Sequence, residues 1–124
     1  MQMSLDELLE WSDVLSIHSP LNERTRNLIG RSELRKMRRS ALLINVARGG
    51  IIDEEALAEA LNKGWIAGAA LDVFSREPLR QSPLYELDDP DTLLASPHTA
   101  WQSDKALKRL VKCIAENIRT FLEA

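Results

Sequence analysis

The sequence of 124 residues has only one cysteine, Cys113, which excludes an internal disulfide and a cysteine-based metal cluster. It has no apolar run near the roughly 20 residues that a membrane-spanning helix needs. It also lacks an excess of basic residues: 16 Lys and Arg stand against 19 Asp and Glu, which argues against a nucleic-acid platform. Its first ten residues, MQMSLDELLE, are polar and acidic, unlike a secretory signal. These absences favour a cytoplasmic protein without nucleic-acid or membrane partners.

The residues that are present describe one domain with alternating helices and strands. The chain is 44% hydrophobic and 28% charged, which is typical of a globular protein. Apolar periodicity predicts helices over 5–11, 31–37, 53–63 and 103–122, and strands over 14–17, 41–47, 66–73 and 93–96. The order of these elements predicts an α/β fold, with a parallel sheet and helices packed against it.

Local signals set the expected ends of these elements. Ser4, Ser32 and Asp53 are expected to cap three of the helices, and Gly64 is expected to end the third. The strand sequence ALLINVA is apolar almost throughout, which indicates burial on both faces of the sheet. Cys113 lies within the pattern of the last helix and is expected in the core. The long, proline-rich stretch 75–92 is expected to be a functional loop.

Polar side chains follow each predicted strand at its carboxyl end. In order along the chain they are His18 and Ser19, then Arg48, then Asp72 with Glu77, and then His98. In open parallel sheets ligands bind beyond the carboxyl ends of the strands, so these side chains are expected to meet at one rim.

This set of residue types suits a carboxylate-bearing substrate. Arg48 can bind a carboxylate through two hydrogen bonds, and His98 can exchange a proton near neutral pH. A neighbouring carboxylate such as Glu77 would orient the histidine ring. No serine lies in a nucleophile-elbow setting, and the two histidines have no metal-ligand spacing. Each residue alone also has a structural interpretation, as a solvated strand-end charge or a packing histidine.

Four motifs together make the chain recognisable. They are DVLSIHSPLNERTRNLIG, LLINVARGGIIDEEALAEAL, GAALDVFSREPL and SPHTAW. In order and spacing the chain resembles the C-terminal half of the nucleotide-binding domain of the NAD-dependent D-isomer-specific 2-hydroxyacid dehydrogenases, over about residues 5–121. The ending SPHTAW is most similar to the glycerate dehydrogenase and hydroxypyruvate reductase branch.

The resemblance implies an oxidoreductase that moves a hydride between NAD or NADP and a small 2-oxo or D-2-hydroxy acid. It implies catalytic roles for Arg48 on the substrate carboxylate and carbonyl, for His98 as acid and base, and for Glu77 as the partner of that histidine. It implies cofactor contacts for Ser19, Pro20, Thr25, Val46, Ala47, Arg48, Asp72, His98 and Ala100, and no metal.

One feature of the family is not found in the sequence. The fingerprint G-x-G-x-x-G is absent, and the glycine pair Gly49 and Gly50 cannot replace it. Residues 1–124 are therefore expected to be a single fragment, the C-terminal part of an NAD(P)-binding Rossmann domain whose first mononucleotide half is missing. On its own it is expected to bind the cofactor weakly, to be inactive, and to form a homo-oligomer through an exposed sheet edge or helix. The alternative is a catalytically dead α/β module that self-associates or binds a partner.

Overall fold

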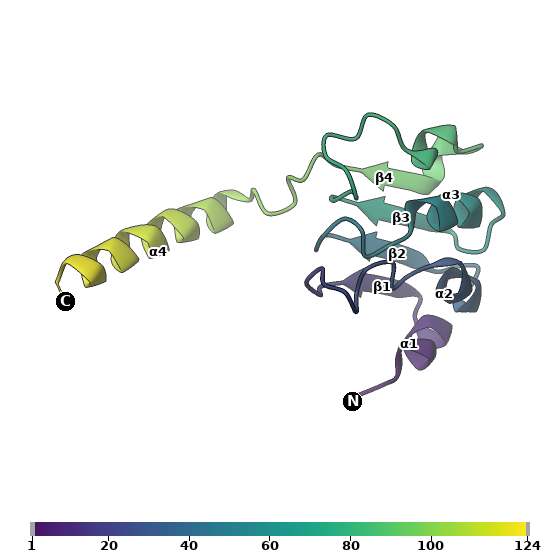
Figure 1. The fold of residues 1–124 in the computed structure, drawn as a ribbon, viewed down its shortest axis with the longest axis horizontal. Helices are drawn as coiled ribbons and strands as arrows, with labels where there is room; N and C mark the ends of the chain where they lie inside the picture. The colour runs from purple at the N-terminus through teal and green to yellow at the C-terminus, as the bar shows by residue number, and fades with distance from the viewer. Residues whose placement is uncertain (1, 124) are drawn as a thin grey trace.

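The computed structural model describes residues 2–123 and contains one four-stranded parallel sheet (Figure 1). The helices are α1 (Leu5–Trp11), α2 (Arg31–Lys36), α3 (Glu54–Asn62) and α4 (Asp104–Leu122), and the strands are β1 (Val14–Ile17), β2 (Leu42–Asn45), β3 (Gly68–Leu71) and β4 (Leu93–Ala95). The strand order is β1-β2-β3-β4, with β1 and β4 as the two edges. One row across the sheet runs from Leu15 through Leu43 and Ala69 to Leu93. The predicted α/β fold with a parallel sheet is confirmed.

Two of the three predicted helix caps are confirmed. The Ser4 side chain accepts a hydrogen bond from the Glu7 backbone N–H and caps α1, and the Asp53 carboxylate caps α3. The prediction for Ser32 is wrong, because Gly30 occupies the cap position of α2 and its N–H donates to Glu33. The Ser32 hydroxyl instead donates to the carboxylate of Glu33, 2.7 Å away.

The hydrophobic core lies on one face of the sheet, against α1, α2 and α3. Leu43 in β2 is fully buried there, together with Leu9, Leu34 and Leu57, which come from the three helices. The helices reach this face because each connection between neighbouring strands crosses on the same side. The carboxyl end of every strand therefore points to one edge of the body, the edge from which α4 departs (Figure 1).

The opposite face of the sheet is open. Side chains alternate along a strand, so Val14, Leu42 and Leu94 point away from the core, and all three are exposed. The burial on both faces that the sequence predicts for the strand ALLINVA is thus wrong within residues 2–123, since Leu42 is exposed. Apolar residues on both faces of a strand indicate that both faces favour burial, but they do not identify the segment that packs on each face.

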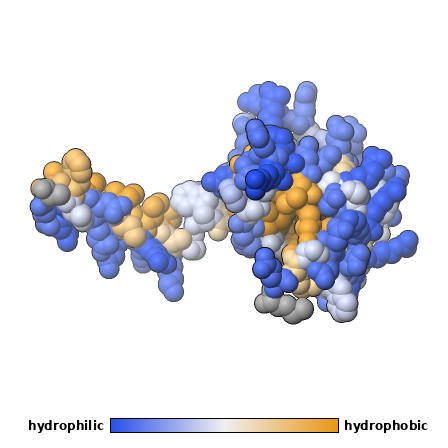
Figure 2. Space-filling view, turned by 60° about the horizontal axis from the view of Figure 1, so that its bottom comes forward, coloured by the Kyte–Doolittle hydropathy of each residue, from blue (hydrophilic) through white to orange (hydrophobic). Residues whose placement is uncertain are grey.

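Helix α4 leaves the body and contributes no buried residue (Figure 1). The expectation that this helix packs against the sheet is wrong, and the expected burial of Cys113 is wrong with it, since that side chain is exposed. Figure 2 shows apolar side chains along one side of this helix and polar side chains along the other. Among residues 2–123, no helix is both long and apolar enough to cross a membrane.

The predicted loop over 75–92 contains two short 3₁₀ helices, Pro83–Glu86 and Pro90–Thr92. Leu84 in the first of them is buried and belongs to the core. This contact fixes the loop against α3 and places its first residues beside the carboxyl end of β3.

Candidate active site

The strongest pairing of predicted site residues joins His98, after β4, to Glu77, after β3. Nδ1 of His98 lies 2.8 Å from Oε2 of Glu77. The other carboxylate oxygen of Glu77 accepts a hydrogen bond from the Phe74 backbone N–H at 3.0 Å. One carboxylate therefore has both oxygens engaged, one by the backbone at the end of β3 and one by the imidazole.

This geometry favours the charged form of Glu77. The hydrogen bond from the Phe74 N–H is the main cause that lowers the pKa of Glu77 below its usual range, and His98 lowers it further. Partial burial and the nearby Asp72 act in the opposite direction without cancelling the effect. Glu77 is thus held as a carboxylate, the form that accepts a hydrogen bond from a histidine ring and orients it.

The loop that carries His98 is fixed by the buried carboxylate of Asp72. Asp72 is 3% exposed and accepts three hydrogen bonds, from Ser96 Oγ at 2.6 Å, the Thr99 N–H at 2.8 Å and the Ala100 N–H at 2.9 Å. Burial acts to raise the pKa of Asp72, but these three hydrogen bonds outweigh it and hold the pKa below its usual value. The donors flank His98 on both sides.

The hydrogen bonds to Asp72 offset the conformational free energy that the backbone of His98 costs. His98 has φ of 56°, in the left-handed region that few residues other than glycine adopt. Such a conformation costs roughly 1–3 kcal/mol and persists only where the surroundings hold it. The indole N–H of Trp101 adds a hydrogen bond to the His98 carbonyl at 3.1 Å. The left-handed backbone is part of how the imidazole is presented to Glu77.

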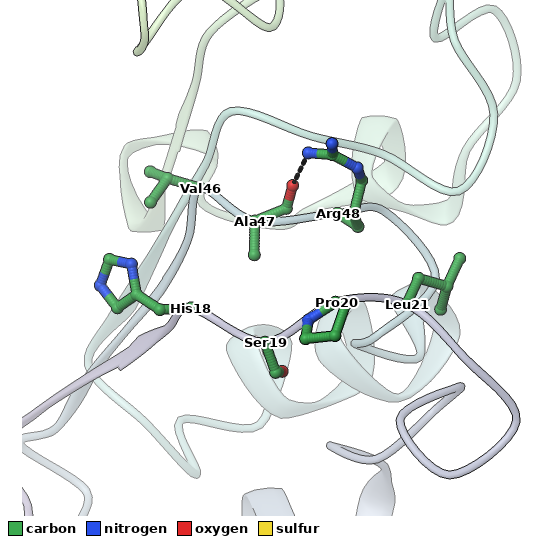
Figure 3. A pocket seen from close by; sticks show the side chains of 7 residues that line it. All are labelled: His18, Ser19, Pro20, Leu21, Val46, Ala47 and Arg48. Atoms are coloured by element: carbon green, nitrogen blue, oxygen red, sulfur yellow. Dashed lines mark hydrogen bonds between the residues drawn. The ribbon is translucent and has the colours of Figure 1, made fainter.

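Arg48 lies in a separate part of the rim, at the turn after β2. With Val46 and Ala47 it faces the segment from His18 to Leu21 across a hollow of about 560 Å³ (Figure 3). Its guanidinium folds back to donate a hydrogen bond to the Ala47 carbonyl at 2.6 Å, and the side chain is exposed. Within residues 2–123 no carboxylate pairs with Arg48, so its remaining donors are available to an external anion.

Asn45 shapes the turn that carries Arg48. Its side chain is 2% exposed, donates to the Arg48 carbonyl at 2.9 Å and accepts from the Ala47 N–H at 3.0 Å. Sequence reasoning missed this residue, although an asparagine within the apolar run ALLINVA is a visible signal of a buried hydrogen-bonding role.

Gly49 brings the Arg48 turn against the segment that leads to Glu77. A Cβ on Gly49 would stand 1.8 Å from the Phe74 carbonyl oxygen and 2.6 Å from the Ser75 nitrogen. The two backbones are therefore as close as a glycine allows. The next residue, Gly50, has φ of +80° and makes the turn itself.

The structure does not bring every predicted site residue to one place. Glu77 and His98 line a second hollow of about 720 Å³, in which Arg48 takes no part. The hydroxyl of Thr25 is engaged within its own loop, since it donates to the Pro20 carbonyl and accepts from the Asn22 N–H. Among residues 2–123 no cluster of three His, Cys, Asp or Glu side chains could hold a metal ion.

The fold and the rim together define a class: an α/β nucleotide-binding domain of the Rossmann type. At its strand ends lie a histidine–carboxylate pair and an arginine that has no carboxylate partner within residues 2–123. Residues 1–100 match the D-isomer specific 2-hydroxyacid dehydrogenase NAD-binding domain, and the chain belongs to that family.

Similar proteins support the same assignment. The chain is 48% identical over 119 residues to a glyoxylate reductase of Thermofilum pendens, covering 96% of this chain and 34% of that protein. It is 42% identical over 120 residues to a glycerate dehydrogenase of Methylorubrum extorquens, covering 97% of this chain and 38% of that protein. The structure of the NAD-complexed D-isomer specific 2-hydroxyacid dehydrogenase of Lactobacillus delbrueckii ssp. bulgaricus superimposes on this chain with a TM-score of 0.87 at 30% identity. The match covers 98% of this chain and 40% of that one. The chain thus spans about a third of the length of these curated relatives.

The close approach at Gly49 predicts a large loss of stability for Gly49→Ala, about 3 kcal/mol, because a methyl group would collide with backbone that has no room to move. Gly64→Ala is the matched control. Gly64 has φ of +62° but open space around it, so only the backbone conformation opposes a side chain, at about 1 kcal/mol. Urea unfolding measures both, and equal losses would show that the approach of the two turns is not a constraint.

The lowered pKa of Asp72 predicts an acid-sensitive fold. Because the pKa is lower in the folded chain than in the unfolded chain, Asp72 stabilises the fold above the unfolded value of about 3.9 and loses this contribution as the pH falls through the folded pKa. Asp72→Asn should be less stable at neutral pH, since the amide NH₂ is a donor and would face one of the two backbone N–H groups that now donate to a carboxylate oxygen. The difference in free energy of unfolding between the variant and the wild type should become smaller below about pH 4. Urea unfolding over a pH series tests this. If the free energies of unfolding of the two proteins differed by the same amount at every pH, the prediction would be contradicted.

Proposed function

We propose that this chain supplies the catalytic rim of an NAD(P)-dependent D-2-hydroxyacid dehydrogenase, acting on a small 2-oxo or 2-hydroxy acid such as hydroxypyruvate or glycerate. The observation that carries the proposal is the Glu77–His98 pair, in which Glu77 engages Nδ1 and leaves Nε2 as the ring nitrogen for a substrate. The family and the named relatives support it, as does the exposed guanidinium of Arg48 at the same rim, which has no carboxylate partner within residues 2–123.

The hollow at the ends of β1 and β2 suits part of a nicotinamide cofactor. Ser19, Pro20, Val46 and Ala47 line it and would hold the nicotinamide end, which supplies or accepts the hydride when bound. The hollow lies where ligands of open α/β sheets bind. The sequence holds no G-x-G-x-x-G turn for the pyrophosphate, so the affinity of the chain alone is expected to be weak.

The side chains have distinct parts in the proposed reaction. Arg48 binds the substrate carboxylate and stabilises negative charge that develops on the reacting oxygen. His98 donates a proton to that oxygen during reduction and removes it during oxidation. Glu77, held as a carboxylate, orients the imidazole of His98.

A chimera tests these roles in a complete enzyme. The matching 120 residues of the Methylorubrum extorquens glycerate dehydrogenase would be replaced by this chain, and glycerate-dependent cofactor reduction would be measured. His98→Asn should lower kcat/KM by about 10²- to 10⁴-fold, the usual contribution of a general acid or base. Arg48→Lys should lower it by about 10²-fold or more, because an ammonium cannot replace the planar fork.

Arg39→Lys is the control for the arginine substitution, because Arg39 is exposed and lies outside the rim. It should leave kcat/KM unchanged. Wild-type activity in the His98→Asn chimera would contradict the proposed acid–base role. An unchanged kcat/KM for Arg48→Lys would contradict the role in substrate binding. A folded chimera without activity would count against the function as a whole.

The exposed apolar side of α4 favours a second candidate function, as a self-associating module. Leu110, Val111, Ile114 and Ile118 are all exposed along it. Two surfaces of one chain are thus uncovered, this side of α4 and the open face of the sheet, and parallel sheets are normally covered on both faces. Residues 103–124 carry five basic and three acidic side chains, whereas the remaining residues carry eleven basic and sixteen acidic ones. This opposite charge favours α4 of one copy docking on the sheet of a second copy.

Light scattering over a range of concentrations tests the self-association. Leu110→Gln combined with Ile114→Gln should shift the chain toward the monomer, because it removes apolar area from the proposed interface. Lys108→Gln combined with Lys112→Gln introduces the same residues on the polar side of α4 and should shift it much less. A wild-type chain that stays monomeric at high concentration would contradict the proposal.

A further inference from the structure

Glu54, in the first turn of α3, reaches across to the loop that carries Glu77. Its Oε1 accepts a hydrogen bond from the Ser75 backbone N–H at 2.7 Å and another from the Ser75 hydroxyl. Its Oε2 accepts from the Ser82 hydroxyl at 3.3 Å. One carboxylate on a core helix thus ties together two points of the loop that are seven residues apart.

The helix alone does not require these contacts. Acidic residues are favourable in the first turn of any helix, and Glu55 satisfies that preference in the same turn. Glu55 is exposed, and its side chain makes no hydrogen bond within residues 2–123. The position and the partners of Glu54 therefore point to a role in the loop rather than in the helix.

The contacts continue from Ser75 to the candidate active site. Ser75 follows Phe74, and the Phe74 N–H donates to Oε1 of Glu77. The other oxygen of Glu77 engages His98. The Phe74–Ser75 peptide also lies against Gly49, on the turn of Arg48. This peptide is thus the point at which the Arg48 turn and the Glu77 loop meet, and Glu54 holds it from the other side.

We propose that Glu54 is a positioning residue for the Glu77–His98 pair, acting through the Phe74–Ser75 peptide. The Phe74 N–H belongs to the preceding peptide unit, which shares the Phe74 Cα with this one, so fixing the Phe74–Ser75 peptide restricts the direction of that N–H and keeps it aimed at Glu77. The Glu77 carboxylate then stands at hydrogen-bonding distance from His98. Without Glu54, two adjacent N–H groups lose their fixed direction together. The significance for catalysis rests on the proposed function, whereas the positioning itself does not.

The positioning can be measured in the chain alone, without cofactor or substrate. Carboxyl-detected NMR gives the titration midpoint of Glu77, and amide hydrogen exchange reports on Phe74 and Ser75. In Glu54→Ala the pKa of Glu77 should rise toward its ordinary value, because the Phe74 N–H that chiefly lowers it is no longer aimed. Exchange at both amides should accelerate by roughly tenfold or more, as expected for the loss of a hydrogen bond to a charged group.

Three further variants separate positioning from charge and from general stability. Glu54→Gln keeps an acceptor oxygen for Ser75 and should retain the Glu77 midpoint. Glu54→Asp keeps the charge and suits the helix start but is one methylene shorter, so it should behave as Glu54→Ala does, and it replaces that variant if alanine prevents folding. Glu55→Ala removes the neighbouring charge and should leave Glu77 unchanged.

A Glu77 midpoint unchanged in Glu54→Ala or Glu54→Asp, with faster exchange at Ser75 only, would overturn the proposal, since Glu54 would then only fasten the loop. A Glu54→Gln chain that matches Glu54→Ala would also overturn it, since charge would be responsible. If the titrations behave as expected while the chimera is inactive, the positioning holds and the proposed function fails.

Discussion

The site depends on a carboxylate that is buried at the end of β3. An ionised group away from water is stable only if its oxygens are hydrogen-bonded, and Asp72 meets this requirement through Ser96, Thr99 and Ala100. The loop after β4 must therefore fold around Asp72, and His98, between those donors, is placed by the same requirement. The left-handed backbone at His98 follows from that arrangement and brings its ring to Glu77. The need to satisfy the buried carboxylate of Asp72 thus determines where the His98 ring lies at the rim.

The other parts of the rim are arranged by side chains that do not face a ligand. Asn45 holds the turn of Arg48, and Glu54 holds the start of the Glu77 loop. Gly49 allows these two segments to touch. Asn45 and Glu54 satisfy backbone groups that would otherwise lack partners where the chain leaves regular structure. These contacts hold the backbone of the rim, whereas the Arg48 side chain makes one hydrogen bond, to the Ala47 carbonyl, and has no carboxylate partner within residues 2–123.

The open face of the sheet and the detached α4 have a common cause. Three consecutive crossovers on one side leave the other side of a parallel sheet uncovered, and nothing in residues 2–123 packs there. The apolar side of α4 is likewise without a partner. Both surfaces carry exposed apolar side chains, and their exposure is the basis of the proposed self-association.

The sequence by itself determined the alternation of helices and strands, the parallel sheet, and the placement of Arg48, Asp72, Glu77 and His98 at strand ends. These follow from local periodicity and from the rule that parallel strands share one carboxyl edge. Only the tertiary structure decided which of these residues touch, since the Glu77–His98 contact spans 21 residues and depends on how two loops close. It also decided that Asp72 is a buried acceptor and that Cys113 on α4 is exposed. Hydrogen bonds between loops and the packing of a helix depend on segments distant in the chain, which no local pattern records.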